Sequence, residues 1–407
     1  MSVVVVGGGQ AAGQLASTLR QEGYEQKITI ITDEPYIPYQ RPPLSKQYLQ
    51  GQVDKQKISL RPQAFYDTKE IEVKSNVRVE AFDTKKNIVQ CNDGTTVPFT
   101  DLVLATGSSP IRLKVPGADL ENVFVFRTVE HVDAIRDSLT EPKRIVIIGG
   151  GYIGLEVAAS CKMLGHEVSV VELEDRLLKR VTSSFMSDYF MKLHVSHGVD
   201  LHLGKAVDEI VGDETGSVAS VHCSDGTSLK ADVVIVGVGI RPVTQLADEQ
   251  NLPVENGIKV DEYCRTTQSN IYAIGDCTNH PNTLLDRRLR LECVPNAMEQ
   301  SRVAAQNIVG KEVKYESYPW FWSDQYDVKL QMSGILDEYE DMVVLGDIAE
   351  GKFALFYFNN GVLCSADAVN SPREFIAAKQ LIGKPVTPEA LRDQNVELKE
   401  LVQQFRS

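Results

Sequence analysis

The chain has 407 residues, of which 43% are hydrophobic, and a formal net charge of −14 at pH 7. This length is enough for two or three domains, and the acidic charge argues against nucleic acid as a partner. Apolar stretches stay shorter than the roughly 18 residues of a membrane span, and no signal-peptide pattern precedes the first apolar run, so we expect no membrane segment and no export.

The cysteines point to a reducing compartment. They are odd in number and scattered, and they form neither a C-x-x-C pair nor the spacing of a metal site. We therefore expect free thiols, no bound metal and a cytoplasmic protein.

A repeated glycine signature is the strongest signal in the chain. An apolar run at 3–6 leads into Gly7-Gly8-Gly9, and a similar run at 145–148 leads into Gly149-Gly150-Gly151. In each copy a helical pattern follows, and then a second apolar strand that ends in acidic residues. These acids are Asp33 and Glu34 in the first copy and Glu172 in the second. They stand roughly 20 residues beyond the turn, which is the spacing of a dinucleotide-binding unit.

The glycines have distinct physical roles in such a turn. The first glycine allows the sharp bend, and the third lets a pyrophosphate approach bare backbone at a helix N-terminus, where free N–H groups and a partial positive charge attract it. The position that packs the helix close to the strand is Ala12 in the first copy and Gly154 in the second. Two such turns predict two dinucleotides, and the chemistry that commonly joins them is hydride transfer between a nicotinamide and a flavin.

The order of elements predicts one doubly wound domain interrupted by another. The first would span 1–110 and 240–319, because an apolar strand at 271–274 reads as a return to it, and the second would span 111–239. The fold class is therefore α/β with two dinucleotide-binding domains, followed by a small α+β domain over 320–407.

The last predicted domain differs from the others in its hydrophobic pattern. Short alternating runs occur at 328–332, 342–345, 353–358 and 362–366, and Asn360-Gly361 between the last two predicts a hairpin. Ser371-Pro372-Arg373-Glu374 has the pattern of a capping box with proline at the first helical position, so we expect a helix towards Leu381.

Several longer motifs carry a family resemblance that covers essentially the whole chain. They are Tyr39-Gln40-Arg41-Pro42-Pro43-Leu44-Ser45-Lys46, Ala105-Thr106-Gly107, Gly149–Glu156, Gly275-Asp276, Val294-Pro295-Asn296-Ala297 and Trp320-Phe321-Trp322-Ser323-Asp324-Gln325. With them the chain resembles the pyridine-nucleotide-dependent flavoprotein reductases of glutathione-reductase-like fold. Within that class it looks like the ferredoxin reductases of bacterial oxygenase systems, some of which serve the catabolism of aromatic hydrocarbons.

One departure from the wider class matters. Glutathione and lipoamide reductases carry a redox-active cysteine pair early in the first domain, whereas here no cysteine precedes Cys91. A dithiol relay is therefore excluded, and electrons must leave directly from the flavin.

The resemblance implies two sets of binding residues, one for each dinucleotide. For FAD they would be Gly7, Gly9, Ala11, Ala12, Asp33, Glu34, Arg41, Lys46, Ala105, Thr106, Gly107, Arg127, Asp276, Val294 and Trp322. For NADH they would be Gly149, Gly151, Tyr152, Ile153, Gly154, Glu156, Glu172, Gly237 and Glu292. Read without the resemblance, Arg127 is an ordinary surface arginine and Asp276 an ordinary turn or helix cap.

Lys46 and Glu156 would be the catalytic pair. In the family these residues meet near flavin N5, which accepts the hydride. A cation there stabilises the negative charge that the ring acquires, and the carboxylate keeps the lysine placed and charged. The alternative is an interdomain ion pair with no catalytic role.

Glu172 predicts the nicotinamide that is used. A carboxylate at a strand end accepts hydrogen bonds from both ribose hydroxyls of NADH and repels the 2′-phosphate of NADPH. Glu174 and Asp175 add negative charge, which Arg176 and Lys179 partly offset.

Two aromatic residues have open roles. Tyr152 could cover the nicotinamide pocket or simply pack at the helix start. Trp322 could lie at the flavin edge on the path of electron exit or simply fill a buried turn.

The resemblance implies an NADH-dependent FAD reductase that passes single electrons to a 2Fe–2S ferredoxin or a rubredoxin, which in turn feeds an oxygenase or P450. One alternative is a reductase of small molecules such as a quinone or monodehydroascorbate. Another is a redox-sensing interaction protein like apoptosis-inducing factor, although the chain has neither the presequence nor the basic character expected of one.

Docking of an acidic ferredoxin on this acidic chain requires a local basic patch. Arg302 is the first candidate, because the family places its helix beside the flavin. Arg287, Arg288 and Arg290 follow, in a segment that reads as a loop. A solvated arginine cluster without a partner is the alternative.

Overall fold

The structure is a computed structural model that describes residues 2–393 and 397–405. The chain forms two compact units and passes between them several times. The first unit comprises Met1–Arg41, Val53–Ser109 and Ile240–Ser317, and the second comprises Pro42–Gln52, Pro110–Gly239 and Tyr318–Ser407. The short segment Pro42–Gln52 thus belongs to the second unit although the sequence on both sides of it belongs to the first. The three-domain division expected from the sequence stays a prediction.

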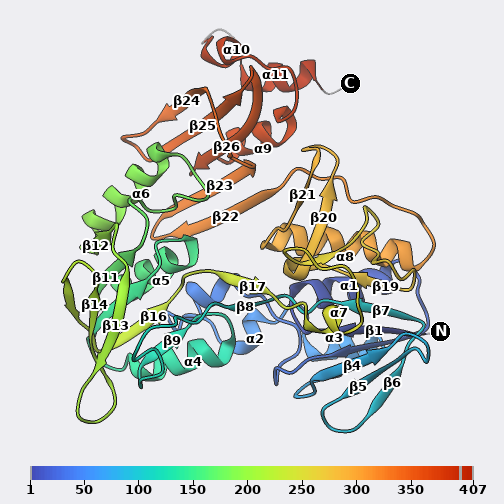
Figure 1. The fold of residues 1–407 in the computed structure, drawn as a ribbon. Helices are drawn as coiled ribbons and strands as arrows, with labels where there is room; N and C mark the ends of the chain where they lie inside the picture. Colours follow the sequence, from blue (N-terminus) through green and yellow to red (C-terminus); the bar gives the residue numbers. More distant parts are fainter. Residues whose placement is uncertain (1, 394–396, 406–407) are drawn as a thin grey trace. The chain divides into compact units, whose positions relative to one another are not determined.

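A five-stranded parallel sheet forms the centre of the first unit (Figure 1). Its strands, in spatial order, are β19 (Ile271–Ala273), β7 (Asp101–Leu104), β1 (Ser2–Val6), β2 (Lys27–Ile31) and β3 (Ile71–Lys74). Val5 of β1 pairs with Ile30 on one side and with Val103 on the other. Because both faces of this sheet are covered, β1 reads as a continuous run of valines rather than an alternating one.

Alternate residues of β1 face two different cores. Val3 and Val5 pack against α1 (Gln10–Gln21) and α8 (Val294–Ile308), whereas Val4 and Val6 pack against a small antiparallel sheet. That sheet consists of β4 (Val79–Asp83), β5 (Ile88–Cys91) and β6 (Thr96–Pro98). The first unit also contains α2 (Lys55–Ile58), α3 (Gln63–Thr68), α7 (Gln245–Glu249), η2 (Gly275–Cys277), and the sheet of β18 (Ile258–Lys259), β20 (Thr278–Asn282) and β21 (Arg287–Leu289).

The second unit repeats this plan. Its parallel sheet has the order β12 (Asp200–Leu203), β11 (Glu167–Glu172), β10 (Arg144–Ile148), β16 (Val233–Val236) and β9 (Val123–Val125). An antiparallel sheet of β13 (Val207–Gly212), β14 (Val218–Cys223) and β15 (Ser228–Lys230) again precedes the strand that returns beside the first one. The helices are α4 (Val129–Ser138), α5 (Tyr152–Met163) and α6 (Ser184–Ser196), and η1 is Pro42–Ser45. The repeat therefore extends well beyond the glycine turns. The paired strands β8 (Ser108–Pro110) and β17 (Ile240–Pro242) lie where the chain passes between the units.

A five-stranded antiparallel sheet completes the second unit. Its strands, in spatial order, are β22 (Trp320–Gln325), β23 (Val328–Gly334), β26 (Val362–Val369), β25 (Lys352–Asn359) and β24 (Asp341–Asp347). Because side chains alternate along a strand, Phe356 and Phe358 of β25 pack with α9 (Pro372–Leu381), α10 (Pro388–Arg392) and α11 (Leu398–Gln404). Leu355 and Tyr357 of the same strand pack with residues of α5 and α6.

These elements confirm the α/β fold class and most of the local predictions. All four alternating runs of the last domain are strands, and Asn360 and Gly361, both with positive φ, turn β25 into β26. The helix after Ser371 is confirmed, but the Ser371 side chain makes no capping hydrogen bond to it. Arg287 and Arg288 lie in β21, which pairs with β20, so the prediction of a loop was wrong there. In the part of the chain that the structure describes, no helix is long and apolar enough to cross a membrane.

The turn between β10 and α5 gives a test of the fold. Gly149 has a φ of +114°, and a Cβ there would lie 2.5 Å from the carbonyl oxygen of Gly237. Gly165, just beyond the same helix, has a φ of +89° but open space around it. Gly165→Ala is expected to lower the free energy of unfolding by about 1–2 kcal/mol through backbone strain alone, and Gly149→Ala by a further ~1–3 kcal/mol because the turn must shift. Urea unfolding measures both changes, and equal losses for the two variants would contradict the tight packing of the turn on Gly237.

Candidate active site

The first glycine turn leaves room for a phosphate. Gly7 has a φ of +114°, and a Cβ there would lie 2.2 Å from the carbonyl oxygen of Ala105, so only glycine fits. Gly9 is the N-cap of α1, and a Cβ added to it would meet no atom within 4 Å. Among the described residues no side chain caps this helix end. The open space and the uncapped N–H groups fit a dinucleotide pyrophosphate.

Most of the residues assigned to FAD belong to the first unit. They are Gly7, Gly9, Ala11, Ala12, Asp33, Glu34, Arg41, Ala105, Thr106, Gly107, Asp276 and Val294. Lys46, Arg127 and Trp322 belong to the second unit, and their predicted place beside the same cofactor stays a prediction. Glu292, assigned to NADH, belongs to the first unit, and its role likewise stays a prediction.

Asp276 is held in place by its neighbours on α8 and β8. Gln300 of α8 accepts a hydrogen bond from the backbone N–H of Gly275 at 2.7 Å, which fixes the short turn that carries Asp276. The Asp276 carboxylate accepts a hydrogen bond from the Ser108 hydroxyl at 2.9 Å. Thr106 is fixed too, since its hydroxyl donates to the carbonyl of Val243 at 2.6 Å. Val294 is the first residue of α8.

Glu34 does not stand alone at the end of β2. Its carboxylate accepts hydrogen bonds from the Arg41 guanidinium at 2.6 Å and from the Tyr39 hydroxyl at 2.5 Å. Asp33, one residue earlier, is exposed. The two acids after the first turn therefore have different surroundings.

The second glycine turn repeats the geometry of the first. Gly149 again has a φ of +114°, and a Cβ on Gly151 would meet no atom within 4 Å. A Cβ on Gly154 would lie 2.1 Å from the carbonyl oxygen of Gly149. The helix therefore packs directly on the turn, and Gly154 is required for that contact.

The Glu172 carboxylate folds back over this turn. One oxygen accepts the backbone N–H of Gly150 at 2.5 Å, and the other accepts that of Glu174 at 2.8 Å. These two bonds orient the acid at the end of β11, and its contact with the ribose of a nicotinamide dinucleotide stays a prediction.

The cations nearest to Glu172 in sequence are already engaged. The Arg176 guanidinium donates to the carbonyls of Thr182 and Lys179, both at 3.0 Å, and to the Ser187 hydroxyl at 2.6 Å. The Lys179 ammonium lies 2.8 Å from a Glu174 oxygen and 3.2 Å from an Asp175 oxygen. In the sequence these two cations seemed to offset the negative charge around Glu172. In the structure they are bound to other groups, so neither pairs with Glu172.

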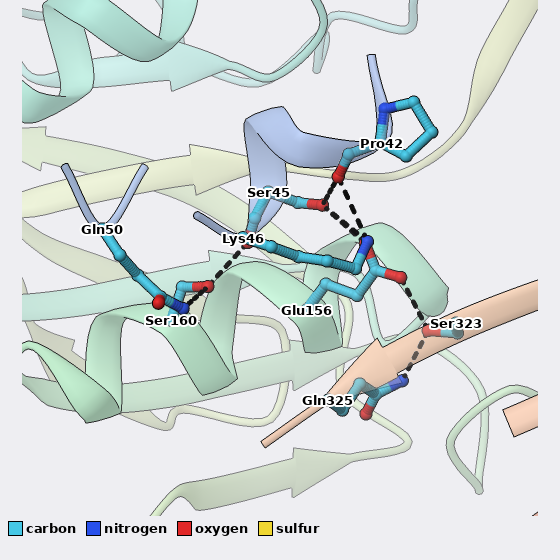
Figure 2. A network of polar contacts seen from close by, with 8 residues as sticks. All are labelled: Pro42, Ser45, Lys46, Gln50, Glu156, Ser160, Ser323 and Gln325. Atoms are coloured by element: carbon cyan, nitrogen blue, oxygen red, sulfur yellow. Dashed lines mark hydrogen bonds and ion pairs between the residues drawn. The ribbon is translucent and has the colours of Figure 1, made fainter. Parts of the chain in front are cut away.

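Lys46 and Glu156 form a buried ion pair within the second unit. Lys46 Nζ lies 2.5 Å from Glu156 Oε2, and the carboxylate side chain is only 2% exposed. The Ser45 hydroxyl donates to the same oxygen at 2.5 Å, and the Ser323 hydroxyl donates to Oε1 at 2.7 Å. Figure 2 shows these side chains converging from η1 and Lys46 just beyond it, from α5 and from β22.

The segment that carries Lys46 is fastened to α5 at a second point. The Ser160 hydroxyl donates to the backbone carbonyl of Ser45 at 2.6 Å, and the Gln50 amide donates to Ser160 Oγ at 2.9 Å. Farther along, the Tyr48 hydroxyl donates to Asp133 of α4 at 2.7 Å. These contacts explain why Pro42–Gln52 belongs to the second unit.

The predicted aromatic residues pack together. Tyr152 begins α5 and lies 5.1 Å from the ring of Phe321, centroid to centroid. Trp322 lies 5.7 Å from Trp320, which also contacts Phe375 of α9. Burial raises the pKa of the Tyr152 phenol, which keeps it neutral. Ile153, the next residue of α5, is exposed. Any role of these residues towards a bound nucleotide stays a prediction.

The candidate docking arginines differ in their freedom. Arg302 is exposed on α8. Arg288 donates to Asn279 and to the carbonyl of Val260, and Arg290 forms an ion pair with Glu292. Arg287 is exposed as well, and the part that any of these arginines plays in docking stays a prediction.

Sequence reasoning missed three buried polar residues next to the charge pair. Ser323 and Gln325 alternate along β22 and face inward, and Gln325 reaches His194 of α6 at 2.8 Å. Burial lowers the pKa of His194 to about 4. Ser323 and Gln325 belong to a motif of the family resemblance and alternate along a strand, but neither signal pointed to their contact with the charge pair.

The cysteines show no sign of thiol chemistry. All seven are free, and five of them are buried. Burial raises the pKa of the Cys161 thiol to about 12, which removes the thiolate that redox exchange requires.

Comparisons with known proteins agree with this geometry. Residues 1–301 match the family model described as pyridine nucleotide-disulphide oxidoreductase, and residues 320–402 match the model described as reductase C-terminal. Rhodocoxin reductase of Rhodococcus erythropolis is 41% identical over 98% of this chain and 94% of its own length. Putidaredoxin reductase of Pseudomonas putida is 38% identical over 98% of this chain and 96% of its own.

A solved structure matches over the full length. It is the covalent complex of putidaredoxin reductase with putidaredoxin, whose matching chain is 38% identical and superposes with a TM-score of 0.96. The match covers 100% of this chain and 99% of that one. One assignment follows from these similarities over the full length and from the two glycine turns of matching geometry, each followed by a hydrogen-bonded acid. The chain belongs to the pyridine nucleotide-disulphide oxidoreductases, and within them to the group that contains rhodocoxin reductase and putidaredoxin reductase.

Proposed function

We propose that this chain is an NADH-dependent FAD reductase that passes electrons one at a time to a 2Fe–2S ferredoxin or a rubredoxin, which feeds an oxygenase or P450. When bound, FAD accepts a hydride and releases its two electrons singly. The observation that carries the proposal is the buried Lys46–Glu156 pair, because Glu156 lies on the helix that follows a glycine turn suited to a nicotinamide dinucleotide.

Each part of the chain has a task in this proposal. The N-termini of α1 and α5 bind the two pyrophosphates, and Asp276 accepts hydrogen bonds from ribityl hydroxyls. Glu172 accepts hydrogen bonds from the ribose of NADH. Lys46 supplies positive charge beside the ring that takes the hydride, and Glu156 holds that charge in place.

Direct electron exit is supported by the thiols. Burial raises the pKa of the Cys161 thiol to about 12, and it also raises the pKa of the half-buried Cys293 to about 12. Free thiols throughout fit a reducing cytoplasm, which we propose as the compartment.

The names of the relatives support a protein acceptor. Rhodocoxin reductase and putidaredoxin reductase are named for the proteins that they reduce, and the latter forms a covalent complex with putidaredoxin. We propose that the acceptor of this chain docks at a locally basic patch that includes Arg302, because an acidic carrier is repelled by the rest of an acidic surface.

The central prediction concerns the acceptor. The purified protein should be yellow and release FAD, and NADH should reduce cytochrome c rapidly only when a small ferredoxin or rubredoxin is added. Arg302→Glu is expected to raise the KM for that carrier about tenfold at low salt and to lose this effect as salt rises. Ferricyanide reduction, which needs no docking, should stay unchanged. Fast turnover of a quinone without any carrier would instead favour the small-molecule reductase, and release of FMN would contradict the cofactor.

The nucleotide preference gives a second prediction. NADH should exceed NADPH in kcat/KM by at least about tenfold, or ~1.4 kcal/mol, because Glu172 repels a 2′-phosphate and Arg176 and Lys179 are already engaged. Glu172→Ala should narrow the gap, chiefly by weakening NADH. Glu167→Ala, at the exposed start of the same strand, is the matched control. Equal efficiency of the two nucleotides with the parent protein would contradict the charge argument.

The charge pair gives a third prediction. Lys46→Met should slow flavin reduction by NADH about tenfold or more in stopped-flow measurements, because charge stabilisation is lost at the ring. The dissociation constant of NADH should change much less. Lys230→Met, an exposed lysine of the same unit, should leave both quantities unchanged. Should Lys46→Met retain its FAD and the parent reduction rate, the pair would be structural only.

A further inference from the structure

A row of buried hydrogen bonds ends on the Glu156 carboxylate. The Ser323 hydroxyl lies 2.7 Å from Glu156 Oε1, the Gln325 amide nitrogen lies 3.2 Å from Ser323 Oγ, and the Gln325 amide oxygen lies 2.8 Å from His194 Nε2. Figure 2 shows the first three of these residues in line. Ser323 and Gln325 are each 1% exposed and His194 is 0% exposed, so the whole row lies away from bulk solvent.

The chemistry of each group fixes the direction of the row. An ionised carboxylate only accepts, so the Ser323 hydroxyl donates to Glu156 and receives a bond from the Gln325 amide N–H. The Gln325 oxygen then faces His194, and His194 must carry its proton on Nε2. Its Nδ1 lies 3.4 Å from the Tyr326 hydroxyl and is left to accept. Every donor in the row therefore points towards Glu156.

The surroundings of His194 keep its ring neutral, as this direction requires. Burial, with a smaller contribution from the nearby ring of His197, lowers the pKa of His194 to about 4, although the hydrogen bond with Gln325 opposes this shift. His197 in turn stacks on Tyr326 at 3.7 Å between ring centroids. Burial raises the pKa of Tyr326, so its hydroxyl keeps the proton that it donates.

Ser323 has a task that no other described residue shares. Glu156 Oε2 receives both Lys46 and Ser45, whereas Oε1 receives only Ser323 among the described residues. Hydrogen bonds in such a row strengthen one another in a dry interior. Without Ser323, the carboxylate loses the contact that sets its rotation about the side-chain axis, and the Lys46 ammonium bound to it loses its fixed direction.

We propose that Ser323, Gln325 and His194 are positioning residues that hold the Glu156 carboxylate, and through it the Lys46 ammonium, in the one orientation that serves hydride transfer. This proposal rests on the proposed function of the Lys46–Glu156 pair. It assigns a role in the reductive step to the C-terminal sheet, which contributes two of the three residues, and to α6, which contributes the third.

The chain offers a matched control for Ser323. Ser333 lies on the neighbouring strand β23 and is 0% exposed, and its hydroxyl has no hydrogen-bond partner among the described residues. Ser323→Ala and Ser333→Ala therefore remove the same atom from the same sheet, but only the first removes a bond to Glu156. Ser323→Thr restores the hydroxyl.

The experiment compares these variants as FAD-loaded proteins. Ser323→Ala should slow flavin reduction by NADH about tenfold and lower the midpoint potential of the flavin, with little change in NADH binding. Ser323→Thr should recover most of the rate, and Ser333→Ala should match the parent protein. A Ser323→Ala variant with the parent rate and potential, or a Ser333→Ala variant with the same defect, would overturn the proposal.

A second readout does not depend on turnover. Nitrogen NMR of histidine-labelled protein should show His194 as the single Nε2–H tautomer in the parent, and Gln325→Leu should abolish that preference while slowing flavin reduction. An Nδ1–H or protonated His194 in the parent would overturn the direction of the row. If NADH does not reduce the flavin of the parent protein at all, the proposed function is wrong. The tautomer of His194 would still show whether the hydrogen bonds run towards Glu156.

Discussion

The buried ion pair of Lys46 and Glu156 is the constraint on which much of the second unit depends. Two charges removed from water are tolerated only when geometry and further hydrogen bonds compensate for lost hydration, and removal of one partner typically costs about 3–5 kcal/mol. Here the compensation comes from Ser45 on η1 and Ser323 on β22, which hydrogen-bond to a carboxylate on α5. Three segments that are far apart in the sequence must therefore stay together. The same contacts draw Pro42–Gln52 out of the unit that surrounds it in sequence.

The Lys46 ammonium makes one strong and two weak hydrogen bonds, and either weak bond can be given up to a new partner. Lys46 Nζ lies 2.5 Å from Glu156, but 3.2 Å from the Pro42 carbonyl and 3.3 Å from Ser45 Oγ. The first contact is short and charge-assisted, whereas the other two are long and weak. A group that approaches the ammonium can take over either weak bond while the ion pair stays intact. In the proposed function Lys46 keeps its charge and also meets a cofactor, and this combination of one strong and two weak bonds suits that task.

The sequence predicted the parts of this site that follow local rules. Glycine turns, the strand before each turn and the acid after the second strand repeat at fixed spacings, and the structure has them where they were expected. The sequence did not reveal Ser323, Gln325 and His194 as a row. Because side chains alternate along a strand, the sequence indicates that Ser323 and Gln325 lie on one face of β22. Which face is buried, and that it contacts Glu156 of α5 and His194 of α6, follows only from the packing of the strand on these helices. For the same reason Arg288 looked free in the sequence, although the paired strand β21 directs it to Asn279 and Val260.

The two units show how one topology can serve two nucleotides. Four parallel strands have the same order in both units, and only the edge strands β19 and β9 come from different points of the chain. Both units also have a three-stranded antiparallel sheet and an open N-cap glycine, so both offer a pyrophosphate the same backbone. They diverge just after the second strand: the strand registers place Thr32 where the second unit has Glu172, and the acids of the first unit follow Thr32. Glu34 in the first unit is bound by Arg41 and Tyr39, whereas Glu172 in the second bonds to the backbone of its own glycine turn. A carboxylate neutralised by an arginine no longer repels phosphate, but one held only by backbone N–H groups still does. In the proposed function, this difference would let the second unit select against a 2′-phosphate.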